Sequence, residues 1–459
     1  MAKDTKIKHK KSNVKLPKHL EHINKMAAGI DVGSKSHFVA VPEGCDAVTV
    51  REFSSFTVNL NELADWLEKC NIETVAMEST GVYWIPLYEL LDSRGFNVNL
   101  VDARKVKNVS GRKTDVLDCQ WLQELHTYGL LSNAFRPNEE TCRLRAYMRQ
   151  RSTLIENATK HIQHMQKALN QMNLQLTNVL SDITGATGLK IIRAIVNGER
   201  NPKVLASFRN KQCKNSEETI EKSLTGSYRE EHIFALKQAL ELYDLYHIKI
   251  IECDKMIEQQ LSKFEKIEGN QAKKQIINKT TKSHSKNTLS FNATSHLVNI
   301  CGVDITQVPG IEASSGLKII SEIGNDLTRW KTYKHFASWL CLCPGNKVSG
   351  GKILNSRTRK SSNMAAQTLR MAASTLHGSK SALGAFYRRM RAKLGAPKAI
   401  TAAAHKLSII IYNMLKEQKE YVDLGQDYYE NKYRARVLNN LRHRANELGF
   451  ALVKNEIAT

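Results

Sequence analysis

Four carboxylates in the N-terminal third of the chain could bind divalent metal ions. Asp31 ends the first apolar segment, GIDVG, and Glu78 ends a later one, VAMEST, immediately before an expected helix. Asp115 and Asp118 are three residues apart in KTDVLDCQWL, a spacing that puts both on one face of a helix. Hard oxygen ligands that converge from two strand ends and one helix are typical of sites that hold Mg²⁺ for phosphodiester chemistry. Each carboxylate alone has an ordinary interpretation as a surface residue, so the prediction depends on the ordered set.

Basic residues accompany this acidic set and dominate the whole chain. Arg112 and Lys113 precede Asp115 and are expected to lie near bound phosphates. Lysine and arginine total 68 against 45 acidic residues, a net charge of +23, which is more than solubility requires. We therefore expect a polyanionic partner, although the charge alone does not distinguish DNA from RNA.

Composition excludes several classes of protein. An apolar fraction of 41% and a charged fraction of 25% argue against global disorder and against a rod made of one coiled coil. No apolar run approaches the roughly 20 residues that span a bilayer, and the first residues lack a signal core, so we expect no membrane segment and no secretion. Nine scattered cysteines without a C-x-x-C pair predict reduced thiols in a cytoplasmic protein.

The elements that must position the carboxylates alternate between strands and helices. Apolar segments at 27–33, 37–42 and 47–53 predict strands, with a turn at Glu43 and Gly44. A helix at 59–70, a strand at 73–80, a helix at 81–95 and a strand at 96–103 then form a βαβ unit with parallel strands. The first 130 or so residues therefore predict an α/β domain with a mixed sheet.

The rest of the chain is predicted to be mainly helical. Residues 139–180 are expected to form one long helix, and residues 231–264 another. The second helix carries a coiled-coil stripe, which pairs either with the first helix or with another chain; its members are Leu236, Leu240, Tyr243, Tyr246, Ile250, Cys253, Ile257 and Leu261. A short helical region follows Gly185, and another short helix covers 334–344. A glycine-rich stretch and two long helices ending at Leu415 complete the prediction.

Motifs in both halves of the chain resemble the insertion sequence 110/1111 family of transposases. They are GIDVGSKSHFVAV, AMESTGVYWIPLYELL and VNLVDARKVKNVSGRKTDVLDCQWLQELHTYGLL in the first domain, and VPGIEASSGLKIISEIG, FASWLCLCPGNKVSGGKI and KAITAAAHKLSIIIYNMLKEQKEY in the last. Residue patterns predict a basic arm (1–26), a helical coiled-coil region (136–266), a basic linker (267–296) and a tail (422–459). The resemblance implies that the segments between them are an RNase H-like domain of the RuvC type (27–135) and a serine transposase domain (297–421).

The resemblance also assigns chemistry to particular residues. Asp31, Glu78, Asp115 and Asp118 would form a DEDD tetrad that binds Mg²⁺, and Ser349 would be the nucleophile that forms a phosphoserine link. Taken from the residues alone, Ser349 is an ordinary loop serine. The phosphate contacts expected around it are Lys347, Gly350, Gly351, Lys352, Arg357, Arg359 and Lys360.

The implied partners are double-stranded DNA from the element ends and the target, a structured non-coding guide RNA, and further copies of the chain. The resemblance implies a homodimer or homotetramer in which acidic and serine domains of different protomers meet. It also implies a nucleoid-associated location in the cytoplasm of a prokaryote.

Two alternative functions remain open from the sequence. In the first, the chain is a RuvC-like structure-specific endonuclease in which the tetrad activates water and Ser349 is structural. In the second, the chain binds nucleic acid without catalysis, against which the intact tetrad argues. A turn at Pro309, Gly310 and Ile311 is either a DNA-contacting helix-hairpin-helix or a plain interhelical turn, because Glu312 would repel phosphate.

Overall fold

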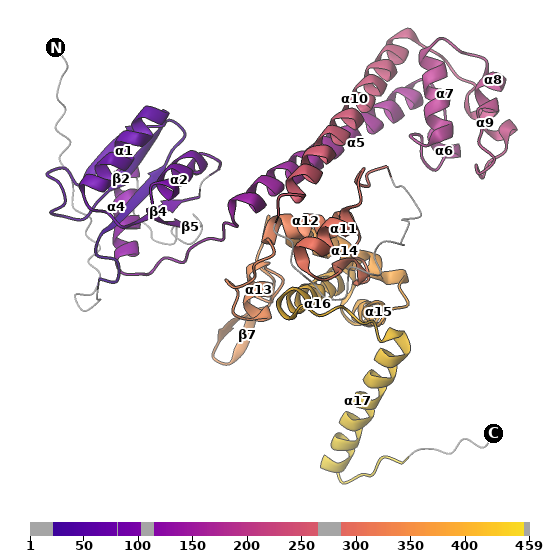
Figure 1. The fold of residues 1–459 in the computed structure, drawn as a ribbon. Helices are drawn as coiled ribbons and strands as arrows, with labels where there is room; N and C mark the ends of the chain where they lie inside the picture. The colour runs from indigo at the N-terminus through magenta and orange to yellow at the C-terminus, as the bar shows by residue number, and fades with distance from the viewer. Residues whose placement is uncertain (1–21, 80, 102–113, 265–285, 454–459) are drawn as a thin grey trace, which may run out of the picture. The chain divides into compact units, whose positions relative to one another are not determined.

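The computed structural model describes residues 22–79, 81–101, 114–264 and 286–453, which fall into two compact units (Figure 1). The first unit ends at Arg136 and the second begins at Pro137. Most of the predicted basic arm (1–26) and much of the predicted linker (267–296) lie outside the described residues. The two units are described separately below.

The first unit is built on one mixed five-stranded sheet in the order β3-β2-β1-β4-β5. Its strands are β1 (Ala27–Val32), β2 (Ser36–Ala40), β3 (Val50–Ser54), β4 (Thr74–Glu78) and β5 (Asn97–Val101). The first three strands are antiparallel, while β4 runs parallel to both β1 and β5. The helices α1 (Thr57–Lys69) and α2 (Trp84–Ser93) provide the crossovers that parallel strands require. The predicted mixed sheet and βαβ unit are confirmed.

The central strand β1 is covered on both faces. Ala28, Ile30 and Val32 belong to the buried cluster that includes residues of α1 and α2. Gly29 lies on the other face, against helix α4 (Asp115–Thr127). A Cβ atom on Gly29 would lie 2.3 Å from the backbone nitrogen of Gln123 and 2.4 Å from the carbonyl oxygen of Cys119. The absence of a side chain at this position is therefore what allows α4 to lie directly on the sheet.

The second unit begins with two long helices that pack antiparallel, α5 (Glu139–Gln171) and α10 (Glu230–Leu261) (Figure 1). Seven of the eight stripe residues on α10 are buried, and Tyr246 is partly buried. The stripe packs against α5 of the same chain, which supports the intramolecular alternative. The prediction of one helix from 139 to 180 is wrong: α5 ends at Gln171, and Asn173 adopts a positive φ of 56° that a helix cannot continue.

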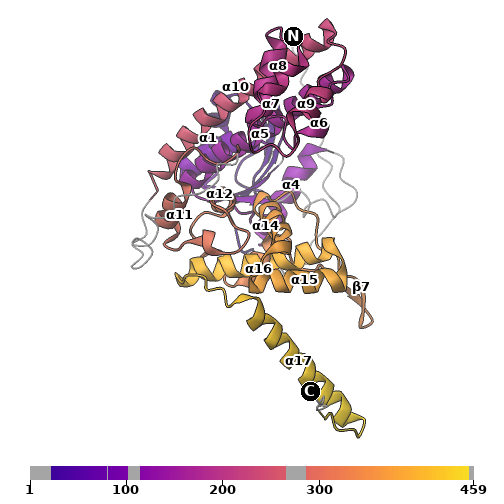
Figure 2. The same ribbon diagram turned by 90° about the vertical axis from the view of Figure 1, so that its right-hand side faces the viewer.

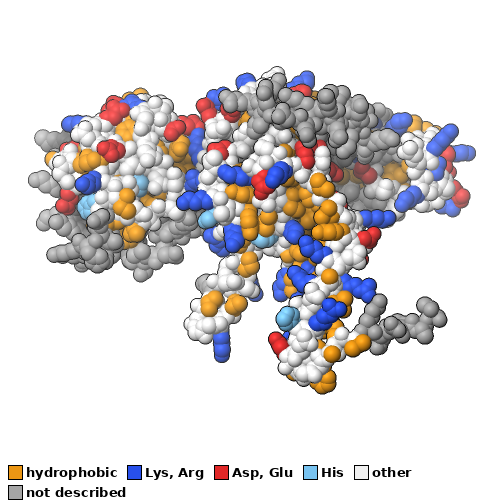
Figure 3. All heavy atoms as spheres, turned by 60° about the horizontal axis from the view of Figure 1, so that its bottom comes forward, with side chains coloured by type: hydrophobic (Ala, Val, Ile, Leu, Met, Phe, Trp, Pro, Cys, Tyr) orange, Lys and Arg blue, Asp and Glu red, His pale blue; other side chains and the backbone are white. Residues whose placement is uncertain are grey.

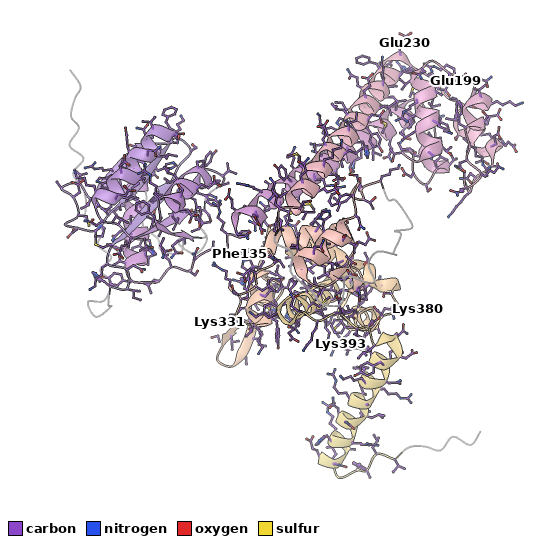
Figure 4. All side chains as sticks on the ribbon, in the orientation of Figure 1. Phe135, Glu199, Glu230, Lys331, Lys380 and Lys393 are labelled. Atoms are coloured by element: carbon purple, nitrogen blue, oxygen red, sulfur yellow. The ribbon has the colours of Figure 1, made fainter. Side chains whose placement is uncertain are left out.

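Four short helices cap the far end of this helix pair, near Glu230 (Figure 4). They are α6 (Leu176–Val179), α7 (Ala186–Val196), α8 (Pro202–Ser207) and α9 (Glu217–Ser223). Ile191, Ile192 and Ile195 of α7 enter the same core cluster as Leu169 and Leu236. The cap therefore buries the apolar ends of both long helices, and its α7 matches the short helical region predicted after Gly185.

A buried ion pair connects the two long helices near their other end. Arg151 of α5 and Asp254 of α10 are 2% and 1% exposed, with 2.5 Å between Nε and Oδ1. The Arg151 guanidinium also donates to the carbonyl oxygens of Asn287 and Thr288, and Ser290 donates its backbone N–H to Asp254. This network fixes the start of the next described segment against the helix pair. Loss of either charged partner would leave the other buried and uncompensated.

The remaining helices form a bundle (Figure 2). They are α11 (Ala293–Cys301), α12 (Ala313–Ile323), α13 (Tyr333–Trp339), α14 (Met364–Thr375), α15 (Ala382–Leu394) and α16 (Ala396–Glu417), with a 3₁₀ turn, η3 (Ile305–Gln307), between α11 and α12. One bidentate interaction, made of two hydrogen bonds of 2.9 Å from Arg149 of α5 to the Glu322 carboxylate of α12, connects the bundle to the long helices. The prediction of two long helices before Leu415 is wrong, because three helices lie there: the α-helix is interrupted between Thr375 and Ala382 and again at Gly395, which has a φ of 79°.

One boundary prediction changes at the start of this bundle, and the tail after it is helical as its sequence predicts. Helix α11 begins at Ala293, inside the segment predicted as a linker. The predicted tail (422–459) is largely a helix, α17 (Gly425–Glu447). All nine cysteines lie in described residues and none forms a disulfide, as expected. In the part of the chain that the structure describes, no helix is long and apolar enough to cross a membrane.

Candidate functional site

Asp31 and Glu78 lie side by side at one edge of the sheet. Strands β1 and β4 are parallel, with Ile30 paired with Met77, and each carboxylate follows directly after its member of that pair. Residues in register on neighbouring strands point to the same face. Glu78 is 9% exposed, and Asp31 is half-buried. The sheet therefore delivers two carboxylates to one location.

Helix α4 brings the other two carboxylates to the same edge. The Thr114 side chain caps the helix by accepting the backbone N–H of Leu117, so Asp115 and Asp118 occupy the first turn. Because α4 lies against Gly29, two residues before Asp31, that first turn lies near the Asp31 carboxylate. Asp115 is exposed and Asp118 is half-buried. The N-terminal end of a helix also stabilises negative charge.

The electrostatics of Asp31 reflect this arrangement. Burial raises the pKa of Asp31 to about 6, and repulsion from Asp115, Glu78 and Asp118, in that order, contributes further. The adjacent Cys119 thiol has its pKa raised to about 12, mainly by burial, with Asp31 contributing. The four carboxylates predicted from the sequence therefore share one electrostatic environment, which a bound cation would stabilise.

The donor set suits a hard divalent cation, because it consists of carboxylate oxygens whose mutual repulsion a bound cation would offset. Among the described residues, however, no three acidic, histidine or cysteine side chains converge closely enough to enclose a metal ion. The chemistry and location fit a metal, while full coordination requires the side chains to move together. The predicted phosphate contacts Arg112 and Lys113 lie outside the described residues.

Ser349 occupies the tip of a two-stranded hairpin in the second unit. The hairpin consists of β6 (Lys347–Ser349) and β7 (Lys352–Asn355), and Ser349 pairs with Lys352. Gly350 and Gly351 form the connecting turn with φ values of 55° and 74°, the conformation of a type I′ turn. The sequence prediction of a glycine-rich stretch missed these strands. The hairpin displays Ser349 on the surface, together with exposed Val348, Ile353 and Leu354.

The basic residues predicted around Ser349 differ in how they are held. Lys352, Arg357 and Lys360 are exposed. Arg359 is also exposed, but its guanidinium donates to the carbonyl oxygen of Ser338 at 2.7 Å, which anchors the segment after the hairpin to α13. The side chain of Lys347 lies outside the described part of the chain. The structure thus collects several cations on and beside the hairpin.

The turn at Gly310 has a structural role. Its φ is 87°, and a Cβ atom there would lie 2.7 Å from the carbonyl oxygen of Ala372 on α14. Ile311 is buried and Glu312 is exposed at the start of α12. The glycine therefore allows the turn to pack against α14, as an interhelical turn requires, and a DNA contact at this turn stays a prediction.

One cluster was not identified from the sequence, in which basic side chains of α15 and α17 lie over aromatic rings of α17. Arg389 lies over the rings of Tyr429 and Tyr433, and Lys432 lies over Tyr428. The signal was present in YYENKYRAR, where Tyr428 and Lys432, and Tyr429 and Tyr433, are each four residues apart, about one helical turn. Only the packing of α17 against α15 brings these residues together with Phe386.

Two protein-family models match the chain in the regions just described. Residues 28–174 match a model of IS110-type DEDD transposases, which covers the acidic cluster, and residues 302–388 match the Transposase IS116/IS110/IS902 family, which covers the hairpin. No curated protein matches the chain. The first match makes the N-terminal domain RuvC-like and indicates a divalent metal, and both matches make DNA the substrate. The chain therefore belongs to the IS110 family of transposases and is an enzyme that acts on DNA as a transposase or recombinase.

Proposed function

We propose that this transposase cuts and rejoins the DNA of its insertion sequence through a covalent phosphoserine at Ser349. In this proposal Asp31, Glu78, Asp115 and Asp118 hold Mg²⁺. The convergence of these carboxylates from β1, β4 and the first turn of α4 carries the metal site of the proposal, and the raised pKa of Asp31 agrees with it. A fold does not gather four carboxylates at a half-buried edge without a cost in repulsion, and such a cost is typical of functional sites.

The hairpin supports the assignment of the nucleophile. Oγ of Ser349 would attack a phosphodiester, forming the Oγ–P bond and releasing the deoxyribose oxygen of the broken strand as a hydroxyl. Attack by the hydroxyl of a second strand on the same phosphorus would reform a phosphodiester and restore the serine hydroxyl. The number of phosphoester bonds is conserved, so rejoining needs no external energy source. A bound Mg²⁺ would polarise a phosphoryl oxygen and lower the pKa of a nearby hydroxyl.

The exposed position of Ser349 suits this step. A DNA duplex is stiff, so it cannot bend into a deep cleft without cost. A side chain at the tip of a two-residue turn can reach a phosphate on the duplex surface without displacement of neighbouring elements. Exposed Lys352, Arg357 and Lys360 would hold the flanking phosphates. Gly350 and Gly351 leave the backbone at the tip unobstructed, since no atom lies within 4 Å of a Cβ built on either.

We further infer that a structured RNA from the element guides the enzyme, and that it works as a homodimer or homotetramer on nucleoid DNA in the prokaryotic cytoplasm. The family resemblance motivates these inferences, and a net charge of +23 is compatible with binding of both nucleic acids.

The test is a covalent-adduct assay. Purified protein is incubated with Mg²⁺, branched or nicked DNA from the element ends and RNA transcribed from those ends, and products are separated on a denaturing gel. Ser349→Ala and Asp115→Ala are expected to abolish a protein–DNA adduct. Matched controls are Ser356→Ala, just after the hairpin, and Asp92→Asn, an exposed acid of α2; both should form the adduct.

The same assay separates the alternatives. Cleavage without an adduct that persists in Ser349→Ala and is lost in Asp115→Ala would mean a nuclease that uses water, and would refute the phosphoserine mechanism. An adduct that forms equally well without RNA would refute guidance by RNA while leaving the nucleophile in place.

A further inference from the structure

A cavity of about 640 Å³ lies between α15, α16 and α17 and the segment that joins the last two helices. Lys380 precedes α15 at the base of α17 (Figure 4), and its carbonyl oxygen accepts the backbone N–H of Gln426 at 3.2 Å. Helix α17 projects from this base (Figure 2), and none of its residues is buried. The cavity lies mostly beyond residue 388, where the matches to family models end, so neither match assigns it a function.

Aromatic rings form the walls of the cavity. The rings come from three elements: Phe386 from α15, Tyr421 from the joining segment, and Tyr428, Tyr429 and Tyr433 from α17. Tyr428 is 48% exposed and Tyr433 is 36% exposed, so part of each side chain faces solvent. Exposed rings that line one concave surface offer flat apolar area to a ligand.

Cations surround these rings. Arg389 lies 4.2 Å from the ring centre of Tyr433 and donates from Nε to the Tyr429 hydroxyl at 2.7 Å. Lys432 lies 5.6 Å from the ring centre of Tyr428, and Lys406 lies 5.5 Å from that of Phe386. No acidic side chain is among the described residues that line the cavity. Lys and Arg side chains also gather along the projecting helix and around its base (Figure 3).

Helix α17 is positioned by few polar contacts, all near its first turn. Arg388 donates to the side-chain oxygen of Gln426 at 2.7 Å, and the Phe386 and Tyr429 rings meet edge to face. Beyond that turn no described residue of α17 is buried. The five basic residues from Lys432 to Arg444 are all exposed, and no acid interrupts them.

We propose that this cavity binds unpaired nucleotides of a nucleic-acid strand, with bases stacked on Tyr428, Tyr433 and Phe386 and phosphates paired with Lys432, Lys406 and Arg436. Stacking on tyrosine beside a cation recognises any base, and an acid-free lining admits the phosphate charge. A duplex hides its base faces in the helical stack, so it cannot use the rings. The inference rests on the proposed function in that the substrate is nucleic acid, and it adds a site for strands that are open during exchange or in a folded RNA.

The experiment measures binding by fluorescence anisotropy with the full chain, in EDTA and at fixed salt. The probes are a fluorescein-labelled 20-nucleotide oligouridylate, an oligothymidylate of the same length and a 20-base-pair duplex. Tyr428→Leu and Tyr433→Leu should each weaken binding of both single strands about tenfold and change duplex binding less than twofold. Tyr433→Phe, which keeps the ring, should bind as the unmodified chain does.

A charge-matched pair tests the role of the cavity. Lys432→Ala removes a cation that lines it, and Arg434→Ala removes an exposed cation of α17 that does not. The first should weaken single-strand binding several-fold more than the second. Replacement of oligouridylate by 5-iodouridine oligonucleotides should give photo-cross-links to Tyr428 or Tyr433, located by mass spectrometry.

Three results would overturn the proposal: unchanged single-strand binding in both tyrosine variants, equal losses in Lys432→Ala and Arg434→Ala, or equal competition by polyglutamate, which would reduce the site to its charge. A tenfold preference for oligouridylate or for oligothymidylate would identify the natural strand as RNA or DNA. Ser356→Ala, at an exposed serine outside the cavity, should bind all probes as the unmodified chain does. EDTA removes divalent metal, so the binding assay does not depend on strand cleavage. Failure of the adduct assay and failure of this binding assay are therefore independent results.

Discussion

The two sites that the proposed mechanism combines are held by the fold in opposite ways. The acidic cluster is built on buried strands, and its helix α4 is fixed by backbone contact with Gly29. Ser349 lies at the tip of a two-stranded hairpin whose described side chains are exposed. The contrast follows the chemistry: a cluster of like charges needs a rigid scaffold to resist repulsion, whereas a nucleophile that attacks a polymer backbone needs access.

This difference has an energetic consequence. Distortion of the first site disturbs the core of its unit, so chemistry and stability change together. Distortion of the hairpin removes almost no buried surface, so chemistry can be lost while the protein stays folded. Substitutions in the acidic cluster and in the hairpin therefore distinguish effects on catalysis from effects on stability.

The largest expected effect comes from Asp31→Asn. We expect DNA cleavage to fall about a thousandfold, because loss of a metal ligand removes several kcal/mol of transition-state stabilisation. The melting temperature in EDTA should rise, because the amide removes repulsion from Asp115, Glu78 and Asp118. Gel assays measure the cleavage rate, and calorimetry measures the melting temperature. Cleavage within a few-fold of the unmodified rate would separate this cluster from catalysis.

Gly29→Ala tests the scaffold without touching a carboxylate. The added methyl group meets backbone atoms of α4, which cannot move as a side chain can, so we expect a loss of about 1–3 kcal/mol in the free energy of unfolding, together with reduced cleavage. Chemical denaturation measures the loss. The control is Gly378→Ala, where no atom lies within 4 Å of an added Cβ, and its stability should change by less than about 0.5 kcal/mol. Equal behaviour of the two variants would contradict the close-packing argument.

A smaller, pH-dependent effect comes from the far end of α4. Burial lowers the pKa of His126 to about 4, and its Nε2 lies 2.9 Å from the Thr74 hydroxyl. At pH values between about 4 and 6.5, this histidine is more protonated in the unfolded chain than in the folded one. The free energy of unfolding therefore decreases as the pH falls through this range. His126→Gln should unfold at a temperature that depends less on pH between 6.5 and 4. Parallel pH profiles for both chains would show that His126 does not cause the acid sensitivity.

The smallest expected effect on stability comes from the hairpin. Replacement of both Gly350 and Gly351 by Ala places side chains at positive φ, which costs about 1–2 kcal/mol per residue within the hairpin. We expect the melting temperature to stay constant and adduct formation to be lost, with faster amide exchange confined to 347–355. Gly350→Asn should retain activity, since asparagine tolerates this conformation. A clear drop in melting temperature would mean that the hairpin belongs to a packed core.

Much of the fold follows from local patterns. The alternation of apolar segments predicted the strands of the mixed sheet, and the a/d stripe on residues 231–264 predicted a helix with one buried face. Both patterns result from burial over a few consecutive residues, so they are visible in the chain itself. The helix end at Gln171 was missed because Asn173 stops the helix through its backbone conformation, which apolar periodicity does not reveal.

The sequence by itself determined the candidate chemistry: Asp31, Glu78, Asp115, Asp118 and Ser349 are recognisable by residue type, order and family motif. Only the tertiary structure decided which of them share an environment, because the pKa of Asp31 depends on burial and on charges from β4 and α4. The tertiary structure also decided that the stripe on α10 packs against α5 and that a cavity forms between α15, α16 and α17. Both depend on contacts between residues far apart in the chain, and such contacts form only when whole elements pack against one another.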